Sequence, residues 1–280
     1  MGYIDAHVHV WTPDTGHYPL ARGFKPEDMK PRSFTPEELF RHTKPARVDR
    51  INLIQMSFYG FDNRYMLDMI ALHNDVFVGT AVIDPLAPRP DQLMTELAKK
   101  RVRAFRIHPA LSRLPPARWL EPASYAKMFE AGARNRQAMS CLIHPDALPE
   151  LDRMCRKFPE TPVIIDHLCR IGANGTIMAK DVDALRAMAG HKQVMVKIGA
   201  FYALGNKQPP YTDLGPLIHQ VVRAFGARRC MWESDCPFQV VHDRYQDSID
   251  LIKNRLEFLS AEEKDWLLRR TAEEFLFKNA

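Results

Sequence analysis

Short apolar runs alternate with longer amphipathic segments along the whole sequence. Segments such as Arg64–His73 and Leu214–Phe225 have helical periodicity and separate the runs. Eight runs are rich in Val, Ile and Phe, as buried parallel strands are. They are Tyr3–Val10, Arg50–Gln55, Val76–Ile83, Val102–Ile107, Ser140–Ile143, Val163–Ile165, Val194–Ile198 and Cys230–Trp232. Eight strands joined by helical crossovers predict an α/β protein with a (β/α)₈ TIM barrel.

The chain length agrees with this architecture. Its 280 residues suit one barrel, so we expect a single domain over residues 1–280. The rival fold, a doubly wound open sheet, usually carries a G-x-G-x-x-G turn, which this sequence lacks. The longest irregular stretch, Trp11–Ser33, follows the first strand, and we expect it to form a wall or lid of a site.

Charge and cysteine usage narrow the choice of partners. The net charge is +5, but Lys and Arg are dispersed and form no basic stripe, which argues against nucleic acid. Five cysteines without a C-x-x-C pair fit reduced thiols in a cytoplasmic protein. The apolar runs are too short to span a membrane. We therefore expect a small, anionic substrate as the partner, while a homo-oligomer stays open.

Polar residues stand where the apolar runs end. In a barrel the carboxyl ends of all strands meet at one rim, so residues far apart in sequence become neighbours there. The candidates at this rim, in chain order, are His7, His9, Gln55, Arg106, His108, His144, Asp166, His167, Glu233 and Asp235. A group of histidines with an acid after the last strand predicts an active site.

The His7-Val8-His9 segment is the strongest single signal. Alternation along a strand places both imidazoles on one face, where they can chelate one divalent cation. A bare H-x-H pattern fits two structural histidines equally well, and the later acid, Asp235, favours the metal site. His144 suits a third histidine ligand, and Asp235 suits a ligand that also takes a proton from water. Glu233 is the rival for the acid's role.

Further residues suit substrate contacts. His167 fits either a metal ligand or a hydrogen-bond donor to a substrate carbonyl, and a structural buried histidine is the alternative. Arg106 and Arg170 suit a bidentate grip on a carboxylate, or salt bridges at the rim. Gln55 and Tyr202 are further candidates for the substrate pocket.

These motifs together resemble a known family. They are Asp5-Ala-His7-Val-His9-Val-Trp11, Gln55 through Asp62-Asn63, Arg103-Ala-Phe-Arg106, Asp166-His167-Leu-Cys-Arg170 and Trp232-Glu-Ser-Asp235-Cys-Pro237. The chain resembles, over essentially its whole length, the amidohydrolase-related group of the amidohydrolase superfamily, to which fuconolactonase, pyrone-dicarboxylate lactonase and sulfomuconolactonase belong. A Gly or Trp pattern typical of that group near the aspartate is altered here to Glu233 and Cys236.

The resemblance implies a barrel hydrolase of lactones or related esters, often with zinc at the first-strand histidines and the last-strand aspartate. Some members of the group work without metal, so the resemblance leaves the metal requirement open. His144 looks more like the metal-dependent decarboxylases of the same superfamily. A non-oxidative decarboxylase therefore stays an alternative, as does a barrel that binds a small molecule without turnover.

The combined expectation is a metal-dependent lactonase. One divalent cation, with zinc as the first choice, is held by His7, His9, His144 and Asp235, and Asp235 and His167 are the catalytic residues. The sequence has no G-x-S-x-G, phosphate-loop or H-E-x-x-H motif, which argues against a serine hydrolase, a phosphate-loop NTPase and the common metalloproteases.

Overall fold

The structure, a computed structural model, describes residues 2–278. Within them, eight parallel strands form one sheet in chain order from β1 to β8. The strands are β1 Tyr3–Val8, β2 Val48–Ile54, β3 Phe77–Ala81, β4 Val102–Ile107, β5 Ala138–Cys141, β6 Val163–Ile165, β7 Val194–Gly199 and β8 Cys230–Glu233. At the carboxyl end the sheet closes on itself, because Asp235 donates a backbone hydrogen bond to His7 and His9 donates one to Cys236. The predicted (β/α)₈ barrel is confirmed.

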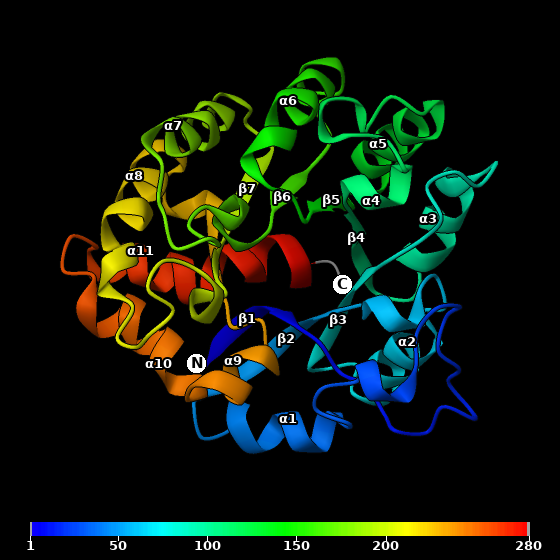
Figure 1. The fold of residues 1–280 in the computed structure, drawn as a ribbon, viewed down its shortest axis with the longest axis horizontal. Helices are drawn as coiled ribbons and strands as arrows, with labels where there is room; N and C mark the ends of the chain where they lie inside the picture. The colour runs from blue at the N-terminus through cyan, green and yellow to red at the C-terminus, as the bar shows by residue number, and fades with distance from the viewer. Residues whose placement is uncertain (1, 279–280) are drawn as a thin grey trace.

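Helices surround the strands (Figure 1). They are α1 Pro36–Thr43, α2 Arg64–Leu72, α3 Pro90–Ala98, α4 Pro109–Ser112, α5 Ala123–Asn135, α6 Leu148–Lys157, α7 Ala179–Ala187, α8 Gly215–Phe225, α9 Phe238–His242, α10 Tyr245–Asp250 and α11 Ala261–Asp265. Thr35 and Glu38 form a capping box at the start of α1, as Ser260 and Glu263 do at α11. None of these helices is long and apolar enough to cross a membrane.

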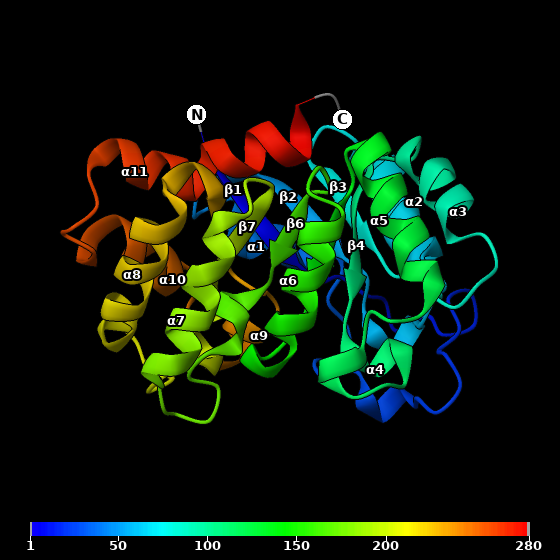
Figure 2. The same ribbon diagram turned by 90° about the horizontal axis from the view of Figure 1, so that it is seen from above.

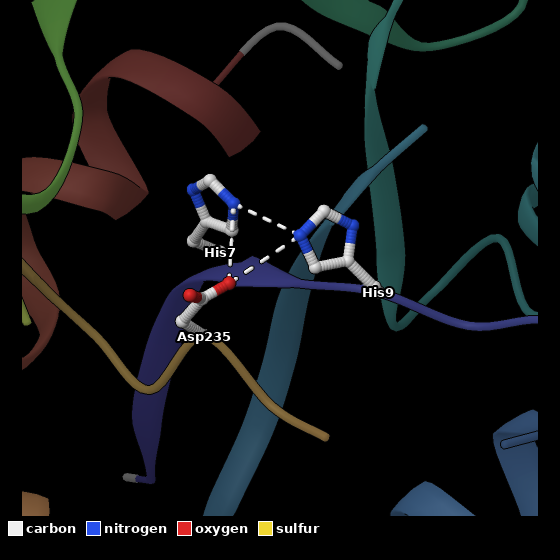
Figure 3. Close-up of side chains that lie close together, drawn as sticks. All are labelled: His7, His9 and Asp235. Atoms are coloured by element: carbon white, nitrogen blue, oxygen red, sulfur yellow. Dashed lines mark hydrogen bonds and ion pairs between the residues drawn. The ribbon is translucent and has the colours of Figure 1, made fainter. Parts of the chain in front are cut away.

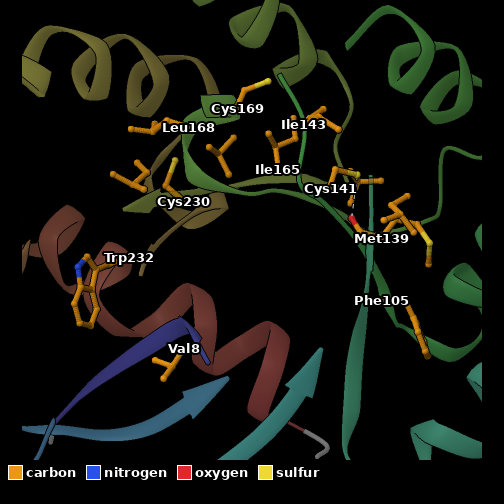
Figure 4. Packing of buried hydrophobic residues seen from close by; sticks show 14 of the residues in the cluster. Val8, Phe105, Met139, Cys141, Ile143, Ile165, Leu168, Cys169, Cys230 and Trp232 are labelled. Atoms are coloured by element: carbon orange, nitrogen blue, oxygen red, sulfur yellow. Dashed lines mark hydrogen bonds between the residues drawn. The ribbon is translucent and has the colours of Figure 1, made fainter. Parts of the chain in front are cut away.

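Two separate hydrophobic cores support the barrel. The larger one fills the space between the sheet and the helices, and Figure 4 shows part of it, including Val8, Phe105 and Trp232. The smaller one lies inside the barrel and includes Ala272 and Leu276 of the C-terminal helical segment. Figure 2 shows this segment, in red, across one end of the barrel, with α4 and α9 toward the opposite end. The C-terminal segment therefore closes the amino-terminal end and leaves the carboxyl rim for a site.

The inside of the barrel has an apolar lower layer and a polar upper layer. On six strands an apolar residue of the inner core is followed, two positions later, by a buried polar residue. Side chains two apart share a face of a strand, so both point inward. The pairs are Val78 and Thr80, Ala104 and Arg106, Ala138 and Ser140, Ile164 and Asp166, Met195 and Lys197, and Met231 and Glu233. Chemistry is thereby confined to the carboxyl half of the barrel.

Two strands differ from the sequence prediction. β5 lies two residues earlier than expected, since Ala138 and Met139 pair with β4 while Ile143 has left the sheet. β1 is irregular, because its pairing with β2 shifts between Asp5 and Val8. Ala6 belongs to the inner core and Val8 to the outer one, so this shift turns the histidine on each side of Val8 toward the barrel mouth.

The Asp5 carboxylate joins the two strands that close the barrel. Its Oδ1 accepts hydrogen bonds from the backbone N–H of His7 at 3.1 Å and of Ser234 at 3.0 Å, and its Oδ2 accepts one from the Tyr245 hydroxyl at 2.6 Å. All of these groups are buried, so water cannot replace the carboxylate. Burial raises the pKa of Asp5 to about 6, against the opposing effect of these hydrogen bonds.

We predict that Asp5→Ala destabilises the protein by about 3–5 kcal/mol, because each buried donor left without a partner costs about 1–3 kcal/mol. Asp5→Asn keeps an oxygen for the two backbone donors and should lose clearly less. Urea unfolding of both variants and the wild type at one pH measures the difference. Each lost partner should cost about 1–3 kcal/mol of unfolding free energy. If Asp5→Ala loses less than about 1 kcal/mol in total, the junction between β1 and β8 does not depend on this carboxylate.

Candidate active site

Three side chains converge at the carboxyl end of β1 and β8 (Figure 3). His7 Nε2 lies 3.3 Å from His9 Nε2, His9 Nε2 lies 3.3 Å from Asp235 Oδ1, and His7 Nε2 lies 3.6 Å from the same oxygen. His7 and Asp235 are buried, and His9 is 2% exposed. Two strand-end histidines and the aspartate after β8 thus present three potential ligand atoms to one point.

The spacing of these atoms fits a divalent cation. Ligands about 2.0–2.2 Å from a tetrahedral zinc ion lie roughly 3.3–3.6 Å from one another. Asp235 Oδ1 is buried and has no hydrogen-bond partner among the described residues, as expected of an atom kept for a ligand. Three protein ligands with a fourth position open to water or substrate are typical of catalytic rather than structural zinc sites.

Neighbouring groups orient the three ligands. His9 Nδ1 lies 2.9 Å from the Ile54 carbonyl oxygen and donates to it, so its Nε2 carries a free lone pair. The Tyr202 hydroxyl donates to Asp235 Oδ2 at 2.7 Å, which leaves Oδ1 to face the histidines. Asp235 has a φ of 59°, in the left-handed region, where Asp occurs more often than most residues. This backbone conformation turns its carboxylate back toward β1.

His167 packs against His7, with the two ring centroids 4.6 Å apart. It begins a turn in which all four residues, His167 to Arg170, have φ between 51° and 56°. Consecutive left-handed residues other than glycine are costly and persist where the surrounding structure holds them, commonly at functional sites. The turn follows β6 directly and presents both His167 and Arg170 to the same cavity.

The charges of the site explain the direction of its pKa shifts. Burial keeps the pKa of His7 well below its ordinary value and that of His9 below it, so both rings are neutral at pH 7, as metal ligands must be. Burial opposes the charged form of His167, but the carboxylates of Glu233 and Asp235 outweigh it and raise the pKa. Burial would raise the pKa of Asp235, yet the His167 charge and hydrogen bonds hold it at about 2.

A cavity of about 570 Å³ opens above these residues, within the usual range for small-molecule sites. Its floor contains His9, Arg106, His167 and Asp235. Its upper wall carries basic side chains, namely Arg170, Lys207 and His242, and apolar ones, which include Met56, Leu142, Leu204 and Phe238. Asp235 is the single carboxylate among the lining residues that the structure describes. The cavity therefore suits a small anion with an apolar body.

Some sequence candidates lie elsewhere. His144 is exposed, three residues beyond the end of β5, and lines a separate cavity with Arg170. Leu142 takes the rim position of β5 instead, so this strand offers no ligand. Gln55 is buried and donates to the Asp62 carbonyl oxygen at 2.6 Å, which fixes the loop after β2. The expected metal set therefore reduces to His7, His9 and Asp235.

Other candidates do meet at the site. Arg106, His167 and Tyr202 line the cavity floor and wall, and Arg170 lies at its exposed mouth. The stretch Trp11–Ser33, which the sequence predicted as a wall or lid, contributes none of the described lining residues. It packs beside the loop after β2, where Ala21 donates a backbone hydrogen bond to Phe58. The stretch after β7 lines the cavity instead, with Tyr202, Leu204 and Lys207, and its irregular sequence gave no signal of this beyond the tyrosine.

Comparisons with known proteins agree with this arrangement. The family model for amidohydrolases matches residues 4–278. L-fucono-1,5-lactonase of Burkholderia ambifaria is 27% identical over 254 residues, covering 87% of this chain and 83% of that protein. The 4-sulfomuconolactone hydrolase of Rhizobium radiobacter is 24% identical over 259 residues, covering 90% and 81%. An amidohydrolase of Burkholderia multivorans solved with bound zinc has a TM-score of 0.82 at 20% identity, with 99% of both chains covered.

We predict that the protein purified without added metal, or after incubation with zinc, carries about one divalent cation per chain. The His7→Ala/His9→Ala double variant should lose it, because two of three ligand atoms are removed. His144→Ala is the matched control and should retain it, since that side chain lies outside the group. Elemental analysis measures all three proteins, and metal lost from His144→Ala would contradict the three-ligand site.

Proposed function

The chain belongs to the amidohydrolase family, and from this premise we propose that it is a zinc-dependent lactonase that opens a cyclic ester of a small carboxylated molecule. The convergence of His7 Nε2, His9 Nε2 and Asp235 Oδ1 at the floor of a cationic cavity is the observation that carries the proposal. The similarity to two lactone hydrolases supports the choice of ester over other bonds.

A divalent cation held by the three atoms would supply the positive charge that lowers the pKa of the attacking water and polarises the ester carbonyl. Asp235 is ionised at neutral pH, because its pKa is about 2, and it accepts the water proton. The same carboxyl group then returns the proton to the ring oxygen that leaves. Tyr202 holds Oδ2 throughout, so the carboxylate keeps one orientation during both transfers.

His167 and Arg106 face the carbonyl side of the reaction. His167 Nε2 lies 4.0 Å from Asp235 Oδ2, and in its protonated form it donates to the developing oxyanion. Arg106 Nη2 lies 3.2 Å from His7 Nε2 and 3.5 Å from His167 Nε2. Arginine has hydrogen-bond donors only, so it cannot bind a cation. When the His7 Nε2 lone pair binds a cation, Arg106 is free to donate to a substrate oxygen instead.

The basic mouth supports an anionic substrate. Arg170 and Lys207 are exposed lining residues and can pair with a carboxylate at the far end of a molecule whose ester lies at the floor. Met56, Leu142 and Phe238 then cover the apolar ring between the two ends.

We predict that the wild type hydrolyses one or more members of a panel of sugar 1,5-lactones and carboxylated unsaturated five- and six-membered lactones. Asp235→Asn should lower kcat by about 100- to 10,000-fold while the protein stays folded, because the proton acceptor is lost. Asp146→Asn, an exposed aspartate outside the cavity lining, is the control. Acid release in a weakly buffered assay measures the rate. Carbon dioxide release instead would support a decarboxylase, and ligand-induced stabilisation without product a binding protein.

We also predict that Arg170→Met raises KM for a carboxylated lactone by about 10- to 100-fold, since a charge-assisted hydrogen bond contributes about 1.5–3 kcal/mol. KM for an uncharged sugar lactone should hardly change. Arg153→Met, which removes an arginine on α6 that pairs with Glu150, controls for lost surface charge. Equal KM changes for both substrates would place the carboxylate elsewhere.

A further inference from the structure

Glu233 contacts both catalytic-site histidines yet does not line the cavity. It is fully buried at the end of β8. Its Oε1 accepts hydrogen bonds from the backbone N–H of His167 at 3.1 Å and from Nδ1 of the same residue at 2.6 Å. Its Oε2 lies 3.0 Å from His7 Nδ1. One carboxylate therefore lies behind both rings, on the side away from the substrate.

The neighbouring strand leaves space for this carboxylate. Gly199 of β7 pairs with Glu233 of β8. A Cβ at position 199 would lie 2.1 Å from the Glu233 carbonyl oxygen and 2.2 Å from its Cγ, distances that no side chain tolerates. Only a glycine at position 199 leaves room for the Glu233 side chain, so the two residues together fix the position of Glu233.

We propose that Glu233 is a positioning residue that holds a proton on Nδ1 of both His7 and His167, so that each Nε2 faces the cavity. A carboxylate oxygen accepts, so each Nδ1 donates to it. Burial raises the pKa of Glu233, and the charges of His167 and Lys197 oppose this rise. This leaves the His7 Nε2 lone pair for a cation, while His167 Nε2 carries the second proton of the protonated ring and can donate to substrate. The benefit to catalysis rests on the proposed function, whereas the tautomers themselves do not.

Lys197 offers the competing arrangement. Its Nζ lies 3.0 Å from His7 Nδ1, and a hydrogen bond from it would move the ring proton to Nε2. Two observations favour Glu233. Lys197 already has an acceptor in Asp166 Oδ1 at 3.0 Å, whereas Glu233 Oε2 has no hydrogen-bond partner among the described residues. A buried carboxylate oxygen needs a donor, and His7 Nδ1 at 3.0 Å is within reach of it. Arg106 Nη2, a donor, lies 3.2 Å from His7 Nε2, which must therefore accept.

The test is the protonation pattern of the histidine rings. Full-length protein labelled with ¹⁵N-histidine gives long-range ¹H–¹⁵N spectra that distinguish the two tautomers, with and without zinc. Signals are assigned by their loss in His7→Gln and His167→Gln. The expected wild-type result is a proton on Nδ1 of both rings, with a second proton on Nε2 of His167 alone. In Glu233→Gln the His167 backbone N–H retains the amide oxygen, so the NH₂ group faces His7 and that ring switches to Nε2–H.

Zinc affinity is the second readout. Loss of a group that orients a metal-binding histidine typically weakens binding about 10- to 100-fold, and we expect this range for Glu233→Gln. Glu150→Gln is the control, because Glu150 is also buried and ion-paired, but on α6 with Arg153. Its tautomers and zinc affinity should equal those of the wild type.

Two outcomes would overturn the proposal. One is a wild-type spectrum with the His7 proton on Nε2, which makes Lys197 the donor and does not depend on the folding of Glu233→Gln. The other is a folded Glu233→Gln protein with unchanged tautomers and zinc affinity. A wild type that hydrolyses no lactone contradicts the proposed function alone and leaves both readouts intact.

Discussion

The buried charges inside the barrel are the constraint on which the site depends. Lys197 and Asp166 are fully buried, and charged groups without water require partners at short range. They lie 3.0 Å apart, and Arg106 approaches the same carboxylate at 3.8 Å. These charges hold the pKa of Asp166 below its ordinary value although burial opposes this. A rigid ionic layer therefore supports the cavity floor, and His7 stands directly on it, 3.0 Å from Lys197.

The apolar layer below stabilises the barrel and so offsets the free-energy cost of burying these charges. Ala104, Ala138 and Ile164 fill the amino-terminal half of the barrel, and the C-terminal segment seals it with Leu276. Stability then comes from one half of each strand and chemistry from the other, as in other barrels of this kind. Asp5 connects stability with chemistry. Its carboxylate joins β1 to the end of β8 and so fixes the spacing of the ligands that these two parts of the chain carry.

The sequence predicted the parts of the site that follow from strand alternation. His7, Arg106 and Asp235 were recognisable because strand ends meet at one rim, whatever their separation along the chain. The sequence predicts His144 at that rim because its apolar run extends to Ile143, whereas β5 ends at Cys141 in the structure. A difference of two residues suffices to move a side chain from the barrel mouth into a loop. Gln55 shows a second limit, because strand position does not reveal that its amide is already bonded within a loop.

The absence of a ligand from β5 changes what the site can do. With Leu142 at that rim position, the ligand atoms of His7, His9 and Asp235 come from β1 and from the segment after β8. Two hydrogen-bond donors of the proposed mechanism lie beside these atoms: Arg106 Nη2 is 3.2 Å from His7 Nε2, and His167 Nε2 is 4.0 Å from Asp235 Oδ2. In the lactonase that we propose, a carbonyl oxygen bound near the three ligand atoms would meet positive charge from a cation and from Arg106. The developing oxyanion would gain the full stabilisation only as it forms.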